Sequence, residues 1–335
     1  MKNVRNIGID VGFGFTKAVN DKMQYLFPSI VGEARNIRYR SGMSSKKLLN
    51  NLVVEYKNDR YFVGELAKRQ SEFTQSTLSD KRVNNLENEI LFMTSLALLD
   101  STGDNAAEFN LVTGLPVDDY LKYKDQLKAQ LINPHKVKLI YDNETESKVI
   151  KVNNCKVIPQ PFGTLFNQLL NNNGDIRKPV YANIKVGIID IGFRTSDFVV
   201  ADSLEFIDKL STSSETALST AYKLIGRKLN EKYNINKPLY QLEEIIRNKS
   251  FTYHSRNINI MDLIDKAYKL TANNIISEIQ GLWPDLWEME KVIITGGGGV
   301  ALYKHLKSYF NNSILVDEGQ FNNAKGYLKL CNRSF

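Results

Sequence analysis

One short pattern occurs twice in this chain, and it constrains the fold more than any other feature. Residues 186–201, VGIIDIGFRTSDFVVA, predict a buried strand, a tight turn at a glycine and a second strand. Residues 7–19, IGIDVGFGFTKAV, repeat the pattern. The positions that match at a constant separation of 180 residues are Asp10, Gly12, Phe13 and Lys17 in the first copy and Asp190, Gly192, Phe193 and Asp197 in the second. The repeat predicts two related domains that face one ligand.

The chemistry of the repeated turn indicates which ligand this is. Backbone N–H groups in such turns form a concavity that binds anions. An aspartate at the tip can hold a hydrated divalent cation, because hard cations prefer oxygen ligands. The ligand implied is therefore a metal-bound nucleotide polyphosphate.

Length and composition fit a two-domain globular protein and exclude several other classes. A chain of 335 residues is too long to fold around one ordinary hydrophobic core, and its net charge of +7 makes the protein only mildly basic. No recognition motif accompanies this charge, so we expect no direct, specific DNA binding. Cys155 and Cys331 are isolated, which favours neither a disulfide framework nor a zinc site. The N-terminus lacks the apolar core of a signal peptide, and the apolar run at 90–99 is too short for a bilayer, so we expect no membrane contact and a cytoplasmic location.

The hydrophobic pattern predicts an α/β chain in which each half opens with a three-stranded meander. In the first half we expect strands at 7–11, 16–20, 25–28, 109–113, 148–152 and 157–159, and helices at 86–99, 120–132 (capped by Asp118) and 164–170. In the second half we expect a helix from Ser213 or Ser214 to about residue 233, a strand at 292–295 that stops at glycines 296–299, a helix at 300–310 and a last helix at 323–330.

Residues 33–47 form a basic segment. Arg35, Arg38, Arg40, Lys46 and Lys47 oppose a single acid, Glu33. Charge runs usually form a solvated surface loop, which is the favoured interpretation. The alternative is a contact with an acidic surface, such as that of another subunit.

Four segments together resemble a known superfamily: residues 10–17, 159–163, 190–197 and 296–299. Their order and spacing are similar to the phosphate 1, connect 1, phosphate 2 and adenosine motifs of the actin-like ATPases, a superfamily shared with sugar kinases and the seventy-kilodalton heat-shock chaperones. IGIDVGFGFTKAV, PQPFG, IDIGFRTSDFVV and the C-terminal FNNAKGYLKL resemble plasmid-segregation actins of the ParM/StbA type and short archaeal actins.

The resemblance implies an α/β, actin-like fold. Two related domains, each a mixed β-sheet with flanking helices, would surround a nucleotide cleft. Domain I would comprise residues 1–175, with the C-terminal helix at 322–335 returning to it, and domain II would comprise residues 176–321.

The resemblance also implies the site residues. In the first turn, the nucleotide phosphates would contact Asp10, Gly12, Phe13, Gly14, Phe15 and Lys17. In the second turn and the adenosine motif, the contacts would be Gly192, Phe193, Arg194, Thr195, Gly296, Gly297 and Gly298. Asp10 and Asp190 would hold Mg²⁺ through water, and Asp190 would be needed for hydrolysis. Lys223 and Arg227 lie four apart on one helix face and could flank the ribose or base, although a solvated basic face is the favoured interpretation.

Gln160 is the second catalytic candidate. Many segregation actins have a glutamate at the matching position, whereas eukaryotic actin has a glutamine. A glutamine cannot act as a general base near neutrality, but it can orient a water for in-line attack. The alternative is that Gln160 only satisfies backbone groups in the turn between its two flanking prolines.

The function expected from this resemblance is a prokaryotic actin that binds and hydrolyses ATP, or GTP, and polymerises into dynamic filaments. A role in plasmid segregation would require an adaptor protein bound to a centromere-like DNA site. The alternatives are a small-molecule kinase, for which no catalytic aspartate in a sugar-binding loop can be identified, and a nucleotide-driven regulatory module of the same superfamily.

Overall fold

The computed structural model describes residues 4–37, 48–71, 74–76, 85–100, 106–141, 144–316 and 319–335. The chain divides into two compact units. Unit 1 comprises residues 1–180 and 320–335, and unit 2 comprises residues 181–319. Most of the basic segment 33–47, including Arg38, Arg40, Lys46 and Lys47, lies outside the described residues, so its two interpretations stay predictions.

Unit 1 is built on a mixed sheet. The order of its described strands is β3-β2-β1-β8-β10-β9-β5-β6-β4-β7. The strands are β1 (Arg5–Val11), β2 (Phe15–Val19), β3 (Gln24–Pro28), β4 (Ile30–Glu33), β5 (Val53–Tyr56), β6 (Asp59–Val63), β7 (Thr74–Ser76), β8 (Ala106–Leu115), β9 (His135–Tyr141) and β10 (Glu144–Pro159). Strands β1, β8 and β10 run parallel, so their carboxyl ends meet at one edge of the sheet.

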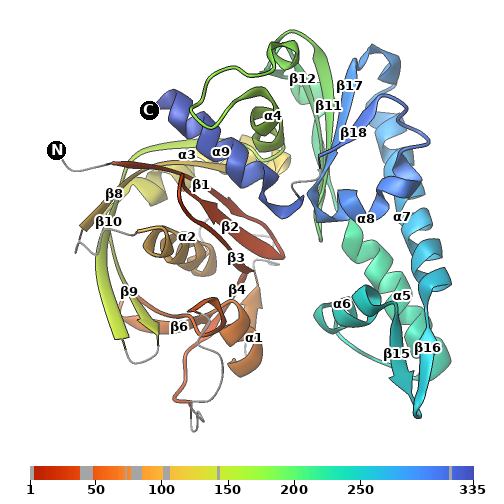
Figure 1. Cartoon of the computed structure of the whole chain (residues 1–335), viewed down its shortest axis with the longest axis horizontal. Helices are drawn as coiled ribbons and strands as arrows, with labels where there is room; N and C mark the ends of the chain where they lie inside the picture. The colour runs from red at the N-terminus through yellow and green to blue at the C-terminus, as the bar shows by residue number, and fades with distance from the viewer. Residues whose placement is uncertain are drawn as a thin grey trace. The chain divides into compact units, whose positions relative to one another are not determined.

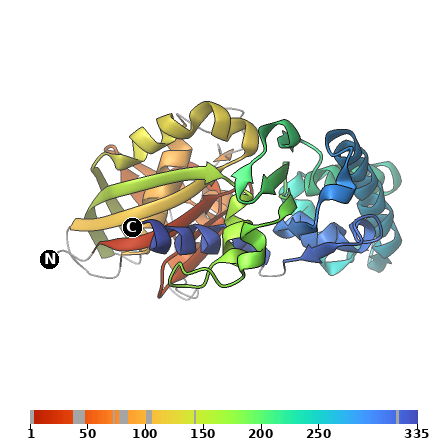
Figure 2. The same ribbon diagram turned by 90° about the horizontal axis from the view of Figure 1, so that it is seen from above.

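Helices cover both faces of this sheet. They are α1 (Glu65–Gln70), α2 (Leu86–Leu98), α3 (Val117–Ile132), α4 (Phe162–Leu169) and α9 (Asn322–Ser334). Helix α2 lies inside the curve of the sheet (Figure 1). Its residues from Asn88 to Leu98 are all buried, as expected for a helix surrounded by strands. Helix α9 lies along β1 and against α4 (Figures 1 and 2), so the C-terminus completes the unit that the N-terminus begins.

Unit 2 repeats the opening meander. Its sheet has the order β13-β12-β11-β17-β18, and β14 also pairs with β12. The strands are β11 (Lys185–Ile191), β12 (Ser196–Asp202), β13 (Glu205–Phe206), β14 (Thr212–Ser214), β17 (Lys291–Thr295) and β18 (Ser313–Leu315). The helices are α5 (Leu218–Tyr233), α6 (Leu239–Asn248), α7 (Met261–Leu282) and α8 (Gly296–Leu306), and β15 (Ser250–Tyr253) forms a hairpin with β16 (Arg256–Asn259).

The predicted fold class is confirmed, as is the meander that opens each half. Strands β1, β2 and β3 are successive antiparallel neighbours in unit 1, and β11, β12 and β13 are their counterparts in unit 2. Their inward-facing Ile, Val and Ala side chains are buried, which explains why the pattern could be read from the sequence.

Several local predictions are wrong, and two of them fail because a distant segment supplies a partner. The two strands expected at 148–152 and 157–159 are one strand, β10, which passes a bulge between Val152 and Asn154 while it pairs with β8. Helix α3 begins at Val117, so Asp118 lies in its first turn and is not its cap. Helix α5 begins at Leu218, because residues 212–214 pair with β12 as β14.

The helix expected at 300–310 begins four residues earlier, within the glycine run. Residues 296–299 form the first turn of helix α8, directly after β17. Packing against the end of β11 outweighs the low helix propensity of glycine.

Candidate functional site

The first turn of unit 1 combines a buried acid with a lysine. Asp10 and Lys17 are cross-strand partners in the β1–β2 hairpin, and Lys17 Nζ lies 2.9 Å from Asp10 Oδ2. The Gly12 N–H donates to the Phe15 carbonyl over 3.1 Å and closes the turn. A Cβ at Gly12 would lie 2.9 Å from Lys17 Nζ, so the absence of a side chain there lets the ammonium group pack over the turn.

Asp10 retains an unused oxygen. The Asp10 side chain is 3% exposed, and its Oδ1 has no hydrogen-bond partner among the described residues. A buried carboxylate oxygen without a partner is costly. The arrangement suits a hydrated cation, because a metal-bound water would supply the missing donor.

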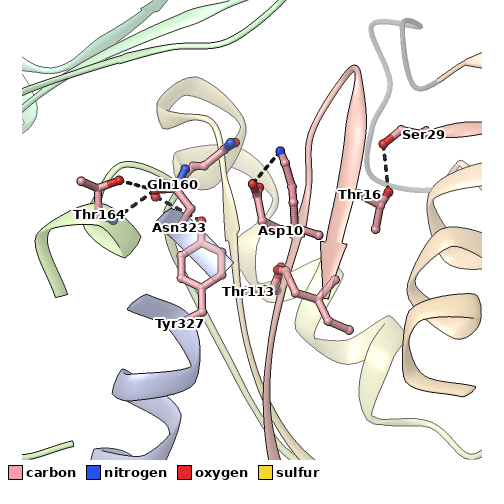
Figure 3. A network of polar contacts seen from close by, with 10 residues as sticks. Asp10, Thr16, Ser29, Thr113, Gln160, Thr164, Asn323 and Tyr327 are labelled. Atoms are coloured by element: carbon pink, nitrogen blue, oxygen red, sulfur yellow. Dashed lines mark hydrogen bonds and ion pairs between the residues drawn. The ribbon is translucent and has the colours of Figure 1, made fainter. Parts of the chain in front are cut away.

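Gln160 lies at the same edge of the unit 1 sheet as Asp10. It directly follows β10, and the registers of β1, β8 and β10 align Ile9 with Thr113 and Thr113 with Val157. The Gln160 N–H donates to the Leu115 carbonyl over 2.7 Å, which fixes the backbone. Figure 3 shows the side chain of Gln160 and the Asp10 ion pair at this edge.

The side-chain amide of Gln160, in contrast, makes no hydrogen bond to any residue in the described ranges. The alternative role, in which this side chain only satisfies backbone groups of the turn, therefore has no contact to support it. The amide remains available to a ligand or a water.

The second turn, in unit 2, has the same backbone geometry and a different charge pattern. The Gly192 N–H donates to the Thr195 carbonyl over 2.9 Å, as Gly12 does to Phe15. Asp190 pairs across the strands with Asp197, at the position that Lys17 occupies in unit 1. Two acids that are cross-strand partners repel each other. They are 6% and 3% exposed, and this buried pair favours a nearby cation.

The glycine run packs tightly on the second turn. Gly296 has φ +82°, and a Cβ there would lie 2.3 Å from the Ile191 carbonyl oxygen and 2.5 Å from Asp190 Oδ1. A Cβ at Gly298 would lie 2.9 Å from the Gly192 carbonyl oxygen. Gly297, between them, is exposed and has open space around it. The N-terminus of α8 therefore lies directly beside Asp190, where its N–H groups favour an anion.

Helix α5 supports the same turn from another side. The Ser219 N–H donates to the Phe193 carbonyl over 2.7 Å, and the Phe193 ring contacts the Tyr222 ring edge-on. Arg194 and Thr195 are half-buried in the turn, whereas Lys223 and Arg227 are exposed on α5. In unit 1, Phe13, Gly14 and Phe15 are likewise half-buried.

The donor set fits Mg²⁺ only if the ion keeps other ligands. No group of three or more His, Cys, Asp or Glu side chains that could enclose a metal occurs within the described residues. Mg²⁺ typically keeps several waters and binds one or two carboxylates together with phosphate oxygens. The unpartnered Asp10 Oδ1 of unit 1 and the buried acid pair of unit 2 each match that pattern on their own.

Sequence reasoning missed the groups that hold these residues in place. The Ser213 hydroxyl donates to Asp197 Oδ1, and Tyr327 and Asn323 of α9 contact the segment around Gln160. The only sequence signal for Asn323 and Tyr327 was the resemblance of the C-terminal segment FNNAKGYLKL to segregation actins, and that resemblance did not indicate which residues they contact. In the described part of the chain, no helix combines the length and apolarity needed to cross a membrane.

A repeated meander in each of two α/β units, with an acid-bearing glycine turn in both, defines the actin-like class of proteins. Family models agree: residues 8–163 match the N-terminal domain of actin-like proteins, and residues 188–308 match the C-terminal domain of archaeal MreB-like actin homologues. No curated protein sequence matches the chain significantly.

Solved structures show the same likeness over nearly the full length. A 15-stranded ParM filament from Clostridium botulinum is 28% identical, with 99% of each chain covered and a TM-score of 0.81. A non-polymerisable quadruple mutant of pCBH ParM is 29% identical, with 98% of each chain covered and a TM-score of 0.77. An archaeal actin homologue in complex with ADP shares the fold at 19% identity, with 99% of this chain and 100% of that chain covered and a TM-score of 0.80. The chain belongs to the actin-like superfamily and has the ParM-type fold of its filament-forming members.

Proposed function

We propose that this protein binds and hydrolyses ATP, or GTP, with Mg²⁺, and that it polymerises into filaments. The observation that carries the proposal is the pair of glycine turns, each with a buried aspartate, together with the unpartnered Asp10 Oδ1. The similarity to a ParM filament supports self-assembly, and the ADP complex of the archaeal homologue supports a nucleotide ligand.

We assign each site residue a role that its contacts support. Asp10 of unit 1 and Asp190 of unit 2 are the acids that would each hold Mg²⁺ through water, and such an ion would supply charge neutralisation for the phosphates. Lys17 binds phosphate oxygens as a point charge. Its ammonium group must then either break its ion pair with Asp10 or contact Asp10 and a phosphate oxygen at the same time. Gly297 leaves space for a nucleotide at the N-terminus of α8. Gln160 orients the attacking water through its unused amide.

The cellular role that we propose is plasmid segregation in the cytoplasm. The support is the likeness to two ParM proteins at 28 and 29% identity over nearly their whole length. The cargo would be reached through an adaptor protein on a centromere-like DNA site, since the chain carries no DNA-recognition motif of its own.

The test follows phosphate release and light scattering on the same sample. Wild-type protein with Mg-ATP should scatter light only above a threshold concentration and should release phosphate as filaments form. Gln160→Ala should assemble normally, hydrolyse about a hundredfold or more slowly and yield long-lived filaments. Gln160→Glu should retain much of the activity.

Gln168→Ala is the matched control, because Gln168 lies on the adjacent helix α4 and is half-buried. It should behave as wild type. Scattering without a concentration threshold would contradict polymerisation and favour a kinase or regulatory module. Wild-type phosphate release by Gln160→Ala filaments would remove Gln160 from the reaction.

A further inference from the structure

The C-terminal helix α9 contacts the Gln160 segment through a buried tyrosine. The Tyr327 hydroxyl donates to the Gln160 carbonyl over 3.1 Å, and the Tyr327 side chain is fully buried (Figure 3). These two residues are 167 positions apart in the sequence. The contact therefore depends entirely on the tertiary structure. It is made to the backbone of Gln160, whose side-chain amide has no hydrogen-bond partner among the described residues.

The Tyr327 ring occupies a slot that glycines form. A Cβ at Gly114 would lie 2.0 Å from the Tyr327 hydroxyl oxygen and 3.0 Å from the Gln160 Cα. A Cβ at Gly163 would lie 2.5 Å from Tyr327 Cε1. These close contacts hold the Tyr327 phenol in one place. Any larger residue at Gly114 or Gly163 would displace it.

The same helix also caps the helix that follows Gln160. Helix α4 has Pro161 at its N-cap position, which offers no side-chain cap. Asn323 of α9 supplies one instead: its Oδ1 accepts from the Thr164 N–H over 3.1 Å and from the Thr164 hydroxyl over 2.8 Å. An N-cap hydrogen bond fixes the start of a helix, and here it comes from 159 residues away.

We propose that Tyr327 is a positioning residue for hydrolysis, acting through Gln160, with Asn323 fixing the adjoining helix. The backbone N–H of Gln160 donates to the Leu115 carbonyl, and its backbone carbonyl accepts from the Tyr327 hydroxyl. The side-chain amide of Gln160 makes no hydrogen bond to a described residue. Such an arrangement fixes the backbone from which the Gln160 side chain projects and leaves the side-chain amide available for another hydrogen bond. This inference rests on the proposed function, since it assigns Tyr327 a role only if Gln160 acts on the attacking water.

The test is Tyr327→Phe, which keeps the ring in its slot and removes one oxygen. The Gln160 carbonyl still accepts from the Gly163 N–H over 3.1 Å, so the variant leaves no buried carbonyl without a partner and should fold. We expect phosphate release per filament subunit to fall about fivefold, the value of one net hydrogen bond, with nucleotide affinity and the assembly threshold unchanged.

The matched control is Tyr56→Phe in the same unit. Tyr56 is also buried, and its hydroxyl donates to Glu89 over 2.6 Å, in a different network. This variant should lose thermal stability and hydrolyse at the wild-type rate. An equal loss of hydrolysis in both tyrosine variants would show a general stability effect and overturn the assignment of Tyr327.

A double mutant separates this inference from the proposed function. If Tyr327 acts through Gln160, adding Tyr327→Phe to Gln160→Ala should cause no further loss. A further fivefold loss would overturn the inference, as would a wild-type rate for Tyr327→Phe while Gln160→Ala is slow. A wild-type rate for Gln160→Ala would refute the catalytic assignment itself, independently of Tyr327.

Discussion

Two adjacent glycines should respond to alanine in opposite ways. Gly296 has φ +82°, and a Cβ there would meet the Ile191 carbonyl oxygen at 2.3 Å and Asp190 Oδ1 at 2.5 Å. The left-handed conformation costs a non-glycine residue about 1–2 kcal/mol. Overpacking against backbone adds about 1–3 kcal/mol. Gly296→Ala should therefore lower the free energy of unfolding by about 2–5 kcal/mol, a large part of the roughly 5–15 kcal/mol of a typical protein.

Gly297→Ala is the control and a probe in its own right. Gly297 is exposed in the first turn of α8, and a Cβ there would have no atom of another segment within 4 Å, so alanine should be neutral or stabilise the fold by up to about 1 kcal/mol. The added methyl group should nevertheless occupy space next to the proposed nucleotide. We expect it to weaken nucleotide binding about tenfold, equivalent to about 1.4 kcal/mol.

Two measurements separate these effects. Urea denaturation followed by circular dichroism gives the free energy of unfolding, and titration with a fluorescent ATP analogue gives the affinity. Equal denaturation midpoints for Gly296→Ala and wild type would refute the packing argument for the glycine run. Wild-type affinity in Gly297→Ala would exclude that residue from the nucleotide site.

The remaining predictions concern the metal and pH. Asp190→Ala should abolish Mg-dependent hydrolysis and weaken nucleotide binding more in Mg²⁺ than in EDTA; an equal loss in both would indicate a structural role in the turn. Burial lowers the pKa of His135 below its ordinary value of 6.5, against the opposing effect of the Glu89 carboxylate. The folded state thus keeps His135 neutral while the unfolded chain takes up a proton, so stability should fall as pH drops below about 6.5, by at most about 1.4 kcal/mol per pH unit. His135→Gln should flatten this slope in urea denaturation from pH 7 to 5.5, and an unchanged slope would exclude His135 as its cause.

The sequence by itself determined the repeated features of this protein. The Asp-x-Gly turns and the alternating strands around them are local patterns, so Asp10, Gly12, Asp190 and Gly192 could be assigned to hairpins without any tertiary information. The regular 180-residue separation then indicated two related units. These predictions succeed because a strand, a tight turn and a strand are specified by neighbouring residues.

Only the tertiary structure decided which segments complete those hairpins. Ser213 or Ser214 was expected to start a helix, but residues 212–214 form β14 instead, because strand β12 offers hydrogen bonds that a helix start could not outweigh. At Gly296 and Gly298 the end of β11 leaves room only for backbone, so glycines can begin helix α8 there. The Tyr327 hydroxyl and the Asn323 cap reach the Gln160 segment from more than 150 residues away. No local pattern specifies such contacts, since they depend on where the folded sheet places α9.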